Sequence, residues 1–542
     1  MLSYRKLAMR VLGRPLHTEG IDSPRPASQR AAALVLTAAM LTTLAAPAFA
    51  KTWYIENGNI TVKAGKIEGT NKVSQGETTD EKDTDTVITN RDKDTASSHT
   101  VTINANGKND KVEVTLKDVN IEANSGHALT SNGDVTLTLK GENHLTGGNG
   151  GRYGGSGITS NGSLTITGGE NDSLTAQGGS SADGISSSGS LTISGGTVNA
   201  TGRDGKDGDG GRGISSSGSV TISGGSTVTA NGGSGTISGG DGIWSGGGVT
   251  ISGGSTVIAN GGNGGSLVGG DGIRSGGGLT VSDGTVTAKG GNGDSKDGYG
   301  GDGIRSGGVV TISGNTVNAA GGYGGKVGGY GICSFDRVAI SGGTVEAAGG
   351  NGSTGGGSGI YSSVIDLSGS LELTAKAGSP SGRALSQKGS ELVLDTIKDK
   401  LGPGAKVTAT DADGKVIDQV STPRPVEPEE SSSSSDGGSA APSAPASPLP
   451  GLTVPDKDGQ RISYTSTQSG NTLTVCVGRF TASFRISLAA LRQLRAEGIE
   501  TITFQTILCS TTLSVDELLA MGGEDAEAVL THRFTDSSLT VG

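Results

Sequence analysis

GGDGIRSGGGLTVSDGTVTAKGG, residues 269–291, decides the fold, because close copies stand immediately before and after it. The preceding copy is GGDGIWSGGGVTISGGSTVIANGG, residues 239–262, and the following one is GGDGIRSGGVVTISGNTVNAAGG, residues 300–322. Each copy opens on a glycine and an isoleucine, and these openings recur every 27 to 31 residues between Gly157 and Gly359. Self-similarity at a fixed period of this length indicates a repeat architecture.

Three short stretches within each repeat alternate between apolar and polar residues, which is typical of β-strands. They read GIxS, LTIS and TVxA, and glycine, serine and asparagine turns separate them. Stacking the repeats aligns the apolar residues as inward columns and sends the threonines of LTIS outward. Three strands per turn in parallel stacking predict an all-β fold, a three-sheet parallel β-helix, with the right-handed crossover usual for parallel strands.

The composition agrees with a solenoid. Of 542 residues, 100 are glycine, and aromatic residues make up only 3%. Too few large apolar side chains are available for a spherical core, whereas a repeat needs only a few aliphatic residues per turn to pack against its neighbours.

The chain divides into five predicted segments. Residues 1–50 are typical of a secretory signal peptide, with an N-terminal membrane anchor as the alternative. Residues 51–125 are expected to form a cap and the first turns, and 126–402 the repeats. A Pro/Ser-rich linker follows at 421–455, and a small α+β module at 456–542.

Two local expectations refine this division. Residues 78–98, TTDEKDTDTVITNRDKDTASS, are predicted to form a polar loop. In the C-terminal module, Ser487 and Ser514 are predicted to cap two helices, and Cys476 and Cys509 either form a disulfide or stay free thiols.

The net charge of the chain indicates which classes of partner it could bind. Without residues 1–50 the chain has 36 basic and 51 acidic residues, a net charge of −15, which disfavours a nucleic-acid partner. Such acidity suits either a secreted protein that binds divalent cations or simple solubility.

The succession NGDVTLTLKGENHLTGG, GITSNGSLTITGG, GISSSGSLTISGGTVNATG resembles a family of secreted bacterial carbohydrate-binding proteins with a polysaccharide-lyase-like right-handed β-helix, common in Gram-positive anaerobes. The resemblance covers roughly residues 100–395. It implies binding of acidic polysaccharide together with calcium, without lyase chemistry, and a secreted or cell-surface location. The sequence departs from the family in its longer Gly-rich loops.

The variable residue of GIxS is the main candidate for ligand binding. It points outward by alternation, and it is small in the early repeats. Later repeats carry Trp244, Arg274, Arg305 and Tyr361 there. Aromatic platforms and guanidinium groups in one row suit an acidic polysaccharide. The alternatives are a self-contained stack, with Arg274 over the Trp244 ring, and a protein partner.

A second candidate is a row of aspartates that precede the opening glycines, of which Asp241, Asp271 and Asp302 fall on successive turns. Carboxylates stacked at roughly 4.8 Å repel one another, and a calcium ion would relieve that repulsion. The alternative is that each aspartate closes its own Asx-turn in solvent.

No catalytic motif can be recognised in the sequence. The five histidines are far apart in sequence, which argues against a histidine-based triad. The row of outward threonines in LTIS leaves little room for the paired carboxylates that acid–base catalysis needs. A non-catalytic carbohydrate-binding protein is therefore expected. The alternatives are a structural stalk or adhesin that displays the C-terminal module and, less favoured, a polysaccharide lyase.

Overall fold

The computed structural model describes residues 50–423, except 68, 106, 108–109 and 151–153, and parts of 452–541. Within that second range, 456–463, 470, 478–481, 507–509, 522–525 and 533–536 are left out. The predicted signal peptide and most of the predicted linker lie outside the described residues. The chain divides into two compact units, 1–428 and 429–542.

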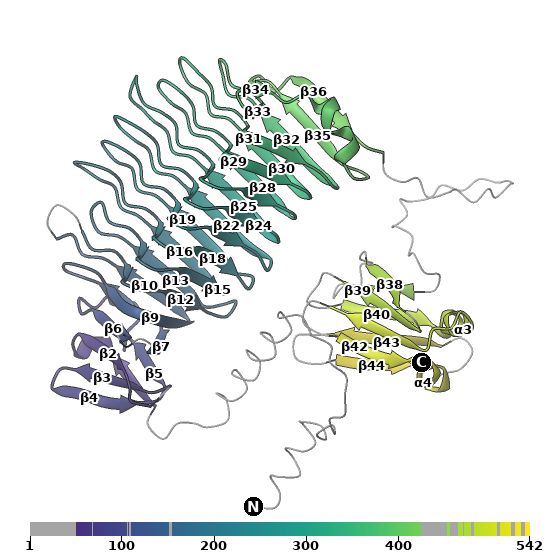
Figure 1. Ribbon diagram of the computed structural model, residues 1–542. Helices are drawn as coiled ribbons and strands as arrows, with labels where there is room; N and C mark the ends of the chain where they lie inside the picture. Colours follow the sequence, from purple (N-terminus) through teal and green to yellow (C-terminus); the bar gives the residue numbers. More distant parts are fainter. Residues whose placement is uncertain are drawn as a thin grey trace, which may run out of the picture. The chain divides into compact units, whose positions relative to one another are not determined.

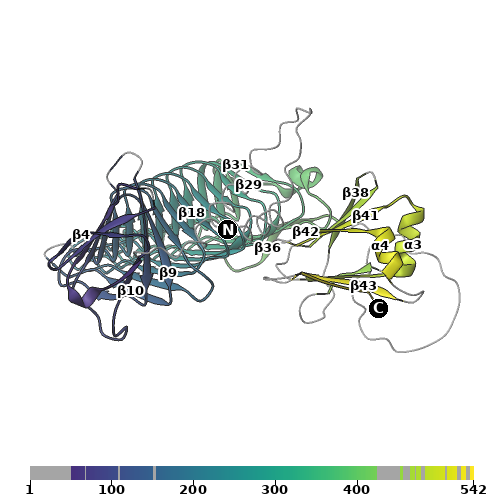
Figure 2. The same cartoon turned by 90° about the horizontal axis from the view of Figure 1, so that it is seen from below.

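The first unit is a parallel β-solenoid of about 13 turns, which confirms the predicted architecture (Figure 1). The strands form one 24-stranded and one 12-stranded sheet. The GIxS and LTIS strands belong to the larger sheet, where three long strands run through both columns. These are β9 (Leu129–Lys140), β29 (Ile332–Ile340) and β31 (Ile360–Leu367). Figure 2 shows the successive turns nested behind one another.

Each repeat contributes one strand to each of three columns. The GIxS strands are β11 (Ile158–Ser160), β14 (Ile185–Ser187), β17 (Ile214–Ser216), β20 (Ile243–Ser245), β23 (Ile273–Ser275) and β26 (Ile304–Ser306). The LTIS strands are β12 (Leu164–Thr167), β15 (Leu191–Ser194), β18 (Val220–Ser223), β21 (Val249–Ile251), β24 (Leu279–Val281) and β27 (Val310–Ile312). The TVxA column of the smaller sheet is β8 (Asn120–Glu122), β10 (Glu142–Thr146), β13 (Ser173–Gln177), β16 (Thr197–Thr201), β19 (Thr227–Asn231), β22 (Ser255–Asn260), β25 (Gly284–Lys289), β28 (Thr316–Ala320), β30 (Gly343–Ala348) and β32 (Leu371–Lys376).

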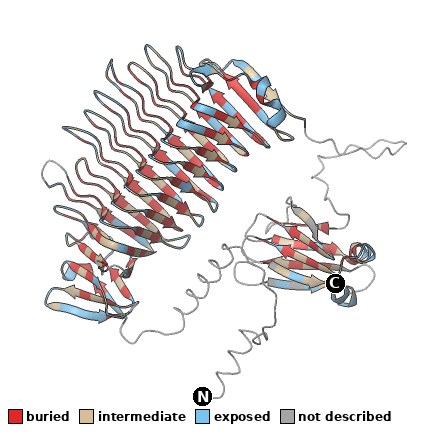
Figure 3. Cartoon of the chain, viewed as in Figure 1, coloured by how far each residue is buried: buried red, intermediate tan, exposed pale blue. Residues whose placement is uncertain are grey.

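The core is the continuous stack of inward aliphatic residues that the sequence predicted. Ile243 pairs in register with Ile214 and Ile273, and all three are fully buried. The column of opening isoleucines from Ile158 to Ile360 is 0% exposed throughout. Along most strands of the repeats, buried residues alternate with residues of intermediate or high exposure, as Figure 3 shows.

The N-terminal end of the solenoid is built from both parallel and antiparallel strand pairs. β1 (Lys51–Tyr54) pairs in parallel with β5 (Thr86–Thr89), and β2 (Ile60–Ala64) pairs in parallel with β6 (Val101–Ala105). These strands, with β7 (Lys111–Lys117), belong to the first turns. β3 (Asn71–Gln75) and β4 (Thr78–Asp83) extend this edge in antiparallel pairing.

The expectation of a polar loop at 78–98 is therefore wrong in its first half. Several of its buried positions are polar, Asp83 and Thr86 among them, which hid the alternation of the strands. Asp83 is fully buried, and its carboxylate accepts a hydrogen bond from the Trp53 indole N–H at 2.7 Å. A buried polar residue with a partner can occupy an inward position that usually holds an aliphatic one.

The far end of the solenoid is closed by antiparallel pairing. β35 (Lys406–Thr410) is the last parallel strand of the 12-stranded sheet, and β36 (Val416–Ser421) covers its edge in the opposite direction. A short hairpin, β33 (Leu385–Gln387) with β34 (Ser390–Glu391), and the 3-10 helix η2 (Leu394–Lys400) lie beside them. A covered edge is less available for pairing with another chain.

Long Gly-rich loops project from one edge of the solenoid as a row of parallel traces (Figure 1). Their two legs are hydrogen-bonded to each other and to the neighbouring loop. The Gly240 N–H donates to the Gly233 carbonyl at 2.9 Å, and the Gly233 N–H donates to the Gly211 carbonyl of the preceding loop at 2.8 Å. A Cβ at Gly240 would lie 2.0 Å from the Gly211 carbonyl oxygen, so only glycine allows this approach.

In its described residues, the C-terminal unit has two four-stranded sheets and two short helices. One sheet is β37 (Leu452–Thr453), β40 (Ala482–Ser487), β43 (Glu527–His532) and β44 (Ser537–Val541); the other is β38 (Thr465–Ser469), β39 (Thr472–Cys476), β41 (Thr501–Gln505) and β42 (Ser510–Ser514). The helices are α3 (Leu488–Ala496) and α4 (Val515–Met521).

Both predicted helix caps are present. The Ser487 hydroxyl accepts the Ala490 N–H at 3.2 Å, and the Ser514 hydroxyl accepts the Glu517 N–H at 3.4 Å. The question of a disulfide falls outside the described residues, because Cys509 and the side chain of Cys476 are not described.

Candidate functional site

The four predicted binding residues lie on one ladder of the larger sheet. Trp244 pairs in register with Arg274, Arg274 with Arg305, Arg305 with Cys333, and Cys333 with Tyr361. Each is the middle residue of a GIxS strand whose isoleucine is buried, so its side chain lies on the outer face. The structure thus brings the predicted row together in the predicted order.

The contacts within this row differ from the predicted stack. The guanidinium over the Trp244 ring comes from Arg212, with its Cζ 4.4 Å from the ring centroid, and not from Arg274. The Arg305 guanidinium lies 5.3 Å from the centroid of the Phe335 ring. Arg274 is left as the most exposed guanidinium of the row, with half of its side chain in solvent.

Aromatic residues close the C-terminal end of the row. The Tyr361 ring stacks on Tyr330, with centroids 4.9 Å apart and planes at 18°. Phe335 is 56% exposed, although it is a large apolar residue, and it lies where a register shift interrupts the pairing of β29 with β31. Cys333 lies in the same row but is buried. The outer face therefore presents aromatic rings on both sides of Arg274 and Arg305.

Sequence reasoning missed Arg212, Tyr330 and Phe335. A signal was present for the first two, because they stand directly before the opening glycines Gly213 and Gly331, where other repeats carry aspartate. Phe335 follows a GIxS strand in a repeat whose turn is altered, and no repeat pattern points to it.

The row of aspartates runs alongside and is buried. The Asp241 Oδ1 accepts the backbone N–H of Asp271 at 2.8 Å, and the Asp271 Oδ1 accepts that of Asp302 at 2.7 Å. The Asp302 Oδ1 accepts the Tyr330 N–H at 2.7 Å. These three carboxylates link successive turns, so the alternative of separate Asx-turns in solvent is wrong.

The second carboxylate oxygens face the arginines. Asp241 Oδ2 lies 3.5 Å from Arg212 Nε, Asp271 Oδ2 lies 4.0 Å from Arg274 Nε, and Asp302 Oδ2 lies 3.2 Å from an Arg305 guanidinium nitrogen. Each buried acid is thus paired with a guanidinium that reaches the outer face. The two rows form one electrostatic unit.

Burial governs the titration of these acids. Desolvation raises the pKa of Asp241, and it raises the pKa of Asp271 well above the ordinary range with further help from the charges of Asp302 and Asp241. The pKa of Asp302 is raised to about 6 by desolvation, against the opposing effect of Arg305. Removing a carboxylate from water disfavours its charged form, and the arginines compensate only in part.

Among the described residues, no group of three or more His, Cys, Asp or Glu side chains is placed to hold a metal ion. Calcium takes six to eight oxygen ligands in proteins. In the aspartate row, one oxygen of each carboxylate accepts a backbone N–H and the other faces an arginine. Calcium at Asp241, Asp271 and Asp302 stays a prediction for experiment.

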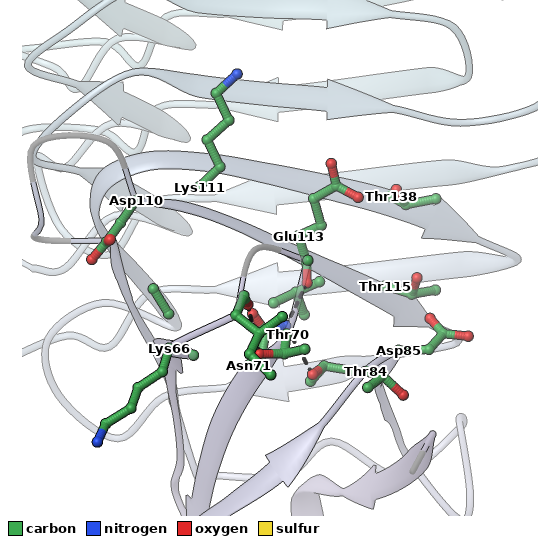
Figure 4. A pocket seen from close by; sticks show the side chains of 16 residues that line it. Lys66, Thr70, Asn71, Thr84, Asp85, Asp110, Lys111, Glu113, Thr115 and Thr138 are labelled. Carbon is green, nitrogen blue, oxygen red and sulfur yellow. Dashed lines mark hydrogen bonds between the residues drawn. The ribbon is translucent and has the colours of Figure 1, made fainter. Parts of the chain in front are cut away.

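A separate cavity of about 520 Å³ lies near the N-terminal end of the solenoid. Its polar lining includes Asn71, whose amide donates to the Thr86 hydroxyl at 2.9 Å and to the Glu113 carbonyl at 2.8 Å. The charged ends of Lys66 and Lys111 point away from each other (Figure 4).

In the parts of the chain that the structure describes, no helix has the length and apolar character needed to cross a membrane. Comparison with protein-family models, curated proteins and solved structures finds no match for this chain, so its classification rests on the fold as a parallel β-solenoid.

Proposed function

We propose that the protein is a secreted, non-catalytic binding protein for acidic polysaccharide. The ligand lies along the aromatic–arginine strip, which we define as Arg212, Trp244, Arg274, Arg305, Phe335 and Tyr361. The resemblance of the repeats to secreted carbohydrate-binding β-helix proteins supports the same function. Calcium is not required in this proposal, because the guanidinium groups supply the positive charge.

The observation that carries the proposal is the position of Arg274. Its side chain is half exposed, its contact with Asp271 is long at 4.0 Å, and its neighbours in register are Trp244 and Arg305. Guanidinium groups bind carboxylates and sulfates in a planar, two-pronged way, and aromatic faces stack on apolar ligand surfaces. A polyanion laid across the turns meets both kinds of contact.

Retention in an affinity gel that contains polygalacturonate tests this. The full chain is compared with a triple variant, Trp244→Ser, Arg274→Ser and Arg305→Ser, since serine already occupies this column at Ser186 and Ser215. We expect the triple variant to lose retention, and neither protein to be retained by neutral dextran.

The matched control replaces the adjacent outward threonines, Thr250, Thr280 and Thr311, by serine. Thermal unfolding of all variants separates lost binding from lost folding. Because Arg305→Ser leaves the Asp302 carboxylate without its closest cation, the variant Arg305→Lys is added to retain the charge. Equal retention of the triple variant and the native chain would contradict the proposal.

A structural stalk or adhesin is the second candidate. It is favoured by the uniformity of the LTIS face, where threonine occupies the outward position in six successive turns from Thr165 to Thr311. A face of small residues suits a spacer that holds the C-terminal unit. Absence of retention on a panel of charged and neutral glycans would favour this function. Release of unsaturated uronate products would instead indicate a lyase.

A further inference from the structure

The guanidinium groups of the aromatic–arginine strip recur once per turn of the solenoid. Asp241, Asp271 and Asp302 belong to three successive turns, those of β20, β23 and β26, and each faces one guanidinium. The guanidinium that faces Asp241 is that of Arg212, which reaches forward from the preceding turn and also covers the Trp244 ring. Successive parallel strands lie roughly 4.8 Å apart. The strip therefore holds three cations in a row, one for each turn.

The charges of this row are sorted by depth. The side chains of Asp241, Asp271 and Asp302 are 7%, 6% and 4% exposed. The arginine side chains that face them are 37%, 50% and 37% exposed. Coulomb energy falls with distance, so the nearest charges dominate what a ligand experiences at the surface. A ligand on the outer face meets the cations first, and the carboxylates lie beneath them.

The three arginines keep hydrogen-bond donors for a ligand. Of the three contacts with aspartates, that of Arg305 with Asp302 is a hydrogen bond, at 3.2 Å. The contacts of Arg212 and Arg274 are longer, at 3.5 and 4.0 Å, and both are made through Nε. A guanidinium carries five N–H donors in a planar fork, so each arginine has donors beyond those that face its aspartate.

The surface beside this row is bare backbone. Gly246, Gly276 and Gly307 directly follow the three GIxS strands, and all three are exposed. Their backbone is held by the ladder of the sheet, as where the Gly276 N–H donates to the Ser245 carbonyl at 2.7 Å. Glycine has no side chain that would obstruct a polymer laid over successive turns. The row of cations is therefore open along one side.

The run of cations is bounded at both ends. In the turn after β26, the corresponding positions of the two rows hold Tyr330 and Cys333, neither of which is a cation. In the turn before β20, the position on the GIxS strand holds Ser215. The next arginine along the aspartate row is Arg383, in the turn of β33. An anionic group is thus favoured on three consecutive turns.

We propose that the aromatic–arginine strip selects a linear polyanion with an anionic group on at least three consecutive units, one for each of the turns of β20, β23 and β26. This inference rests on the proposed function and narrows the ligand class to glycans whose charges are contiguous. A sugar unit in an extended chain is about as long as one turn, so neighbouring units can reach neighbouring arginines. A polymer with a charge on every second unit meets at most two of the three.

Contiguous charges are favoured because the contacts act together. A single ion pair at an exposed position contributes little to binding. Once one anionic unit is bound, the next unit is already beside the next arginine, so the second and third contacts form at a high effective concentration. Carboxylates and sulfates present the same two-pronged acceptor to a guanidinium. The spacing of the charges, more than their chemical type, is therefore the property that the strip reads.

The first test compares two samples of partly methyl-esterified polygalacturonate with equal total charge. In one the free carboxylates lie in blocks, and in the other they are distributed at random. Affinity gels are run at constant ionic strength with a chelator, so that calcium does not crosslink the polymer. We expect the full chain to bind the blockwise sample at least about tenfold more tightly than the random one.

This design separates the inference from the proposed function. Equal retention by the two samples would overturn the selection of contiguous charges and would leave binding of acidic polysaccharide intact. Absence of retention by both samples and by unesterified polygalacturonate would contradict the proposed function, and this inference with it.

The second test measures how many units the strip contacts. Calorimetric titration with oligogalacturonates of one to six units should show a gain of at least about tenfold from dimer to trimer and smaller gains beyond. Arg274→Ser removes the central cation and should abolish the gain at the trimer. The matched control is Arg337→Ser, because Arg337 is 49% exposed, faces Asp366 at 3.8 Å and lies outside the strip.

Thermal unfolding of both variants checks that the fold is retained, and Arg274→Lys tests whether charge alone restores binding. A trimer that binds no more tightly than the dimer, or a gain that continues evenly to six units, would overturn the proposal. Equal affinities of the Arg274→Ser and Arg337→Ser variants for the trimer would overturn it as well.

Discussion

The Asp271 carboxylate accepts the backbone N–H of Asp302 at 2.7 Å, which joins two acidic residues on successive turns of the solenoid. Both side chains are buried, and both have an arginine three residues further along the chain. This hydrogen-bonded row of aspartates thus places like charges next to each other where water does not screen them. Its stability depends on how many of these carboxylates are ionised.

The first prediction is that the solenoid becomes more stable as pH falls from 7 to about 5. Burial raises the pKa of Asp302 from 3.8 to about 6, so the folded chain binds a proton more tightly than the unfolded one. The contribution to stability is complete below about pH 4 and is lost as pH rises through about 6. It amounts to roughly 3 kcal/mol for this residue.

Thermal unfolding between pH 4 and 8 measures this effect. The variant Asp302→Asn cannot ionise, and its side-chain oxygen can still accept the Tyr330 N–H, so its midpoint should vary less with pH. Asp207→Asn, at an exposed loop position, serves as the control and should keep the native profile. A native midpoint that rises from pH 5 to 7 would contradict the prediction.

The second prediction concerns the glycine legs. Gly240→Ala should destabilise the loops, because the new methyl group would approach the Gly211 carbonyl oxygen to 2.0 Å and backbone must move. Gly208→Ala is the matched control, since nothing lies within 4 Å of the added carbon and the position is not in the left-handed region. Limited proteolysis should cut the Gly240→Ala variant faster than the control within residues 232–242. Equal rates of cleavage for both variants would contradict the close backbone contact between neighbouring loop legs.

The third prediction concerns the inward column. Ile273→Asp places a carboxylate between Ile243 and Ile304, both fully buried, and should unfold several turns. Ile273→Val keeps the site apolar and should cost about 1 kcal/mol. Urea unfolding followed by circular dichroism distinguishes the two, and a folded Ile273→Asp chain with native stability would disprove the inward stack.

The fourth prediction concerns calcium. A calcium ion at Asp241, Asp271 and Asp302 would have to displace the arginine contacts, so the contacts in place predict no change in the melting temperature of a chelator-treated sample on adding millimolar calcium. Magnesium at the same concentration controls for ionic strength. A rise with calcium alone, abolished by Asp271→Asn, would establish the calcium site that the sequence suggested.

The repeating part of the fold could be predicted because each turn repeats the same pattern of apolar and polar residues. The alternation in GIxS, LTIS and TVxA predicted the strand columns, and between two of these strands Gly195 and Gly196 make a corner with φ values of 101° and 75°. The segment 78–98 was misread because the inward position of Asp83 is polar, and its indole partner Trp53 lies 30 residues away.

The sequence predicted which residues lie in one row on the outer face, but it did not predict which side chains in that row contact one another. Alternation places Trp244 and Arg274 on the outer face, but it does not tell which cation covers the indole. That cation is Arg212, which reaches it from the aspartate row of the preceding turn. Packing between columns depends on side-chain direction in three dimensions, and a repeat aligned on one column does not carry that information.

The register from turn to turn has a consequence for how this chain can change length. Deleting residues 242–271 would join Asp241 to Gly272, where another aspartate preceded it, and Ile214 would then pair with Ile273 as it now pairs with Ile243. The column of buried isoleucines, the row of serines that end the GIxS strands and the glycines of the loop legs would all remain continuous across the junction. Whole repeats can therefore be gained or lost without breaking a ladder, whereas smaller differences in length, such as those between repeats of 27 and 31 residues, have to fall in the segments between the paired strands.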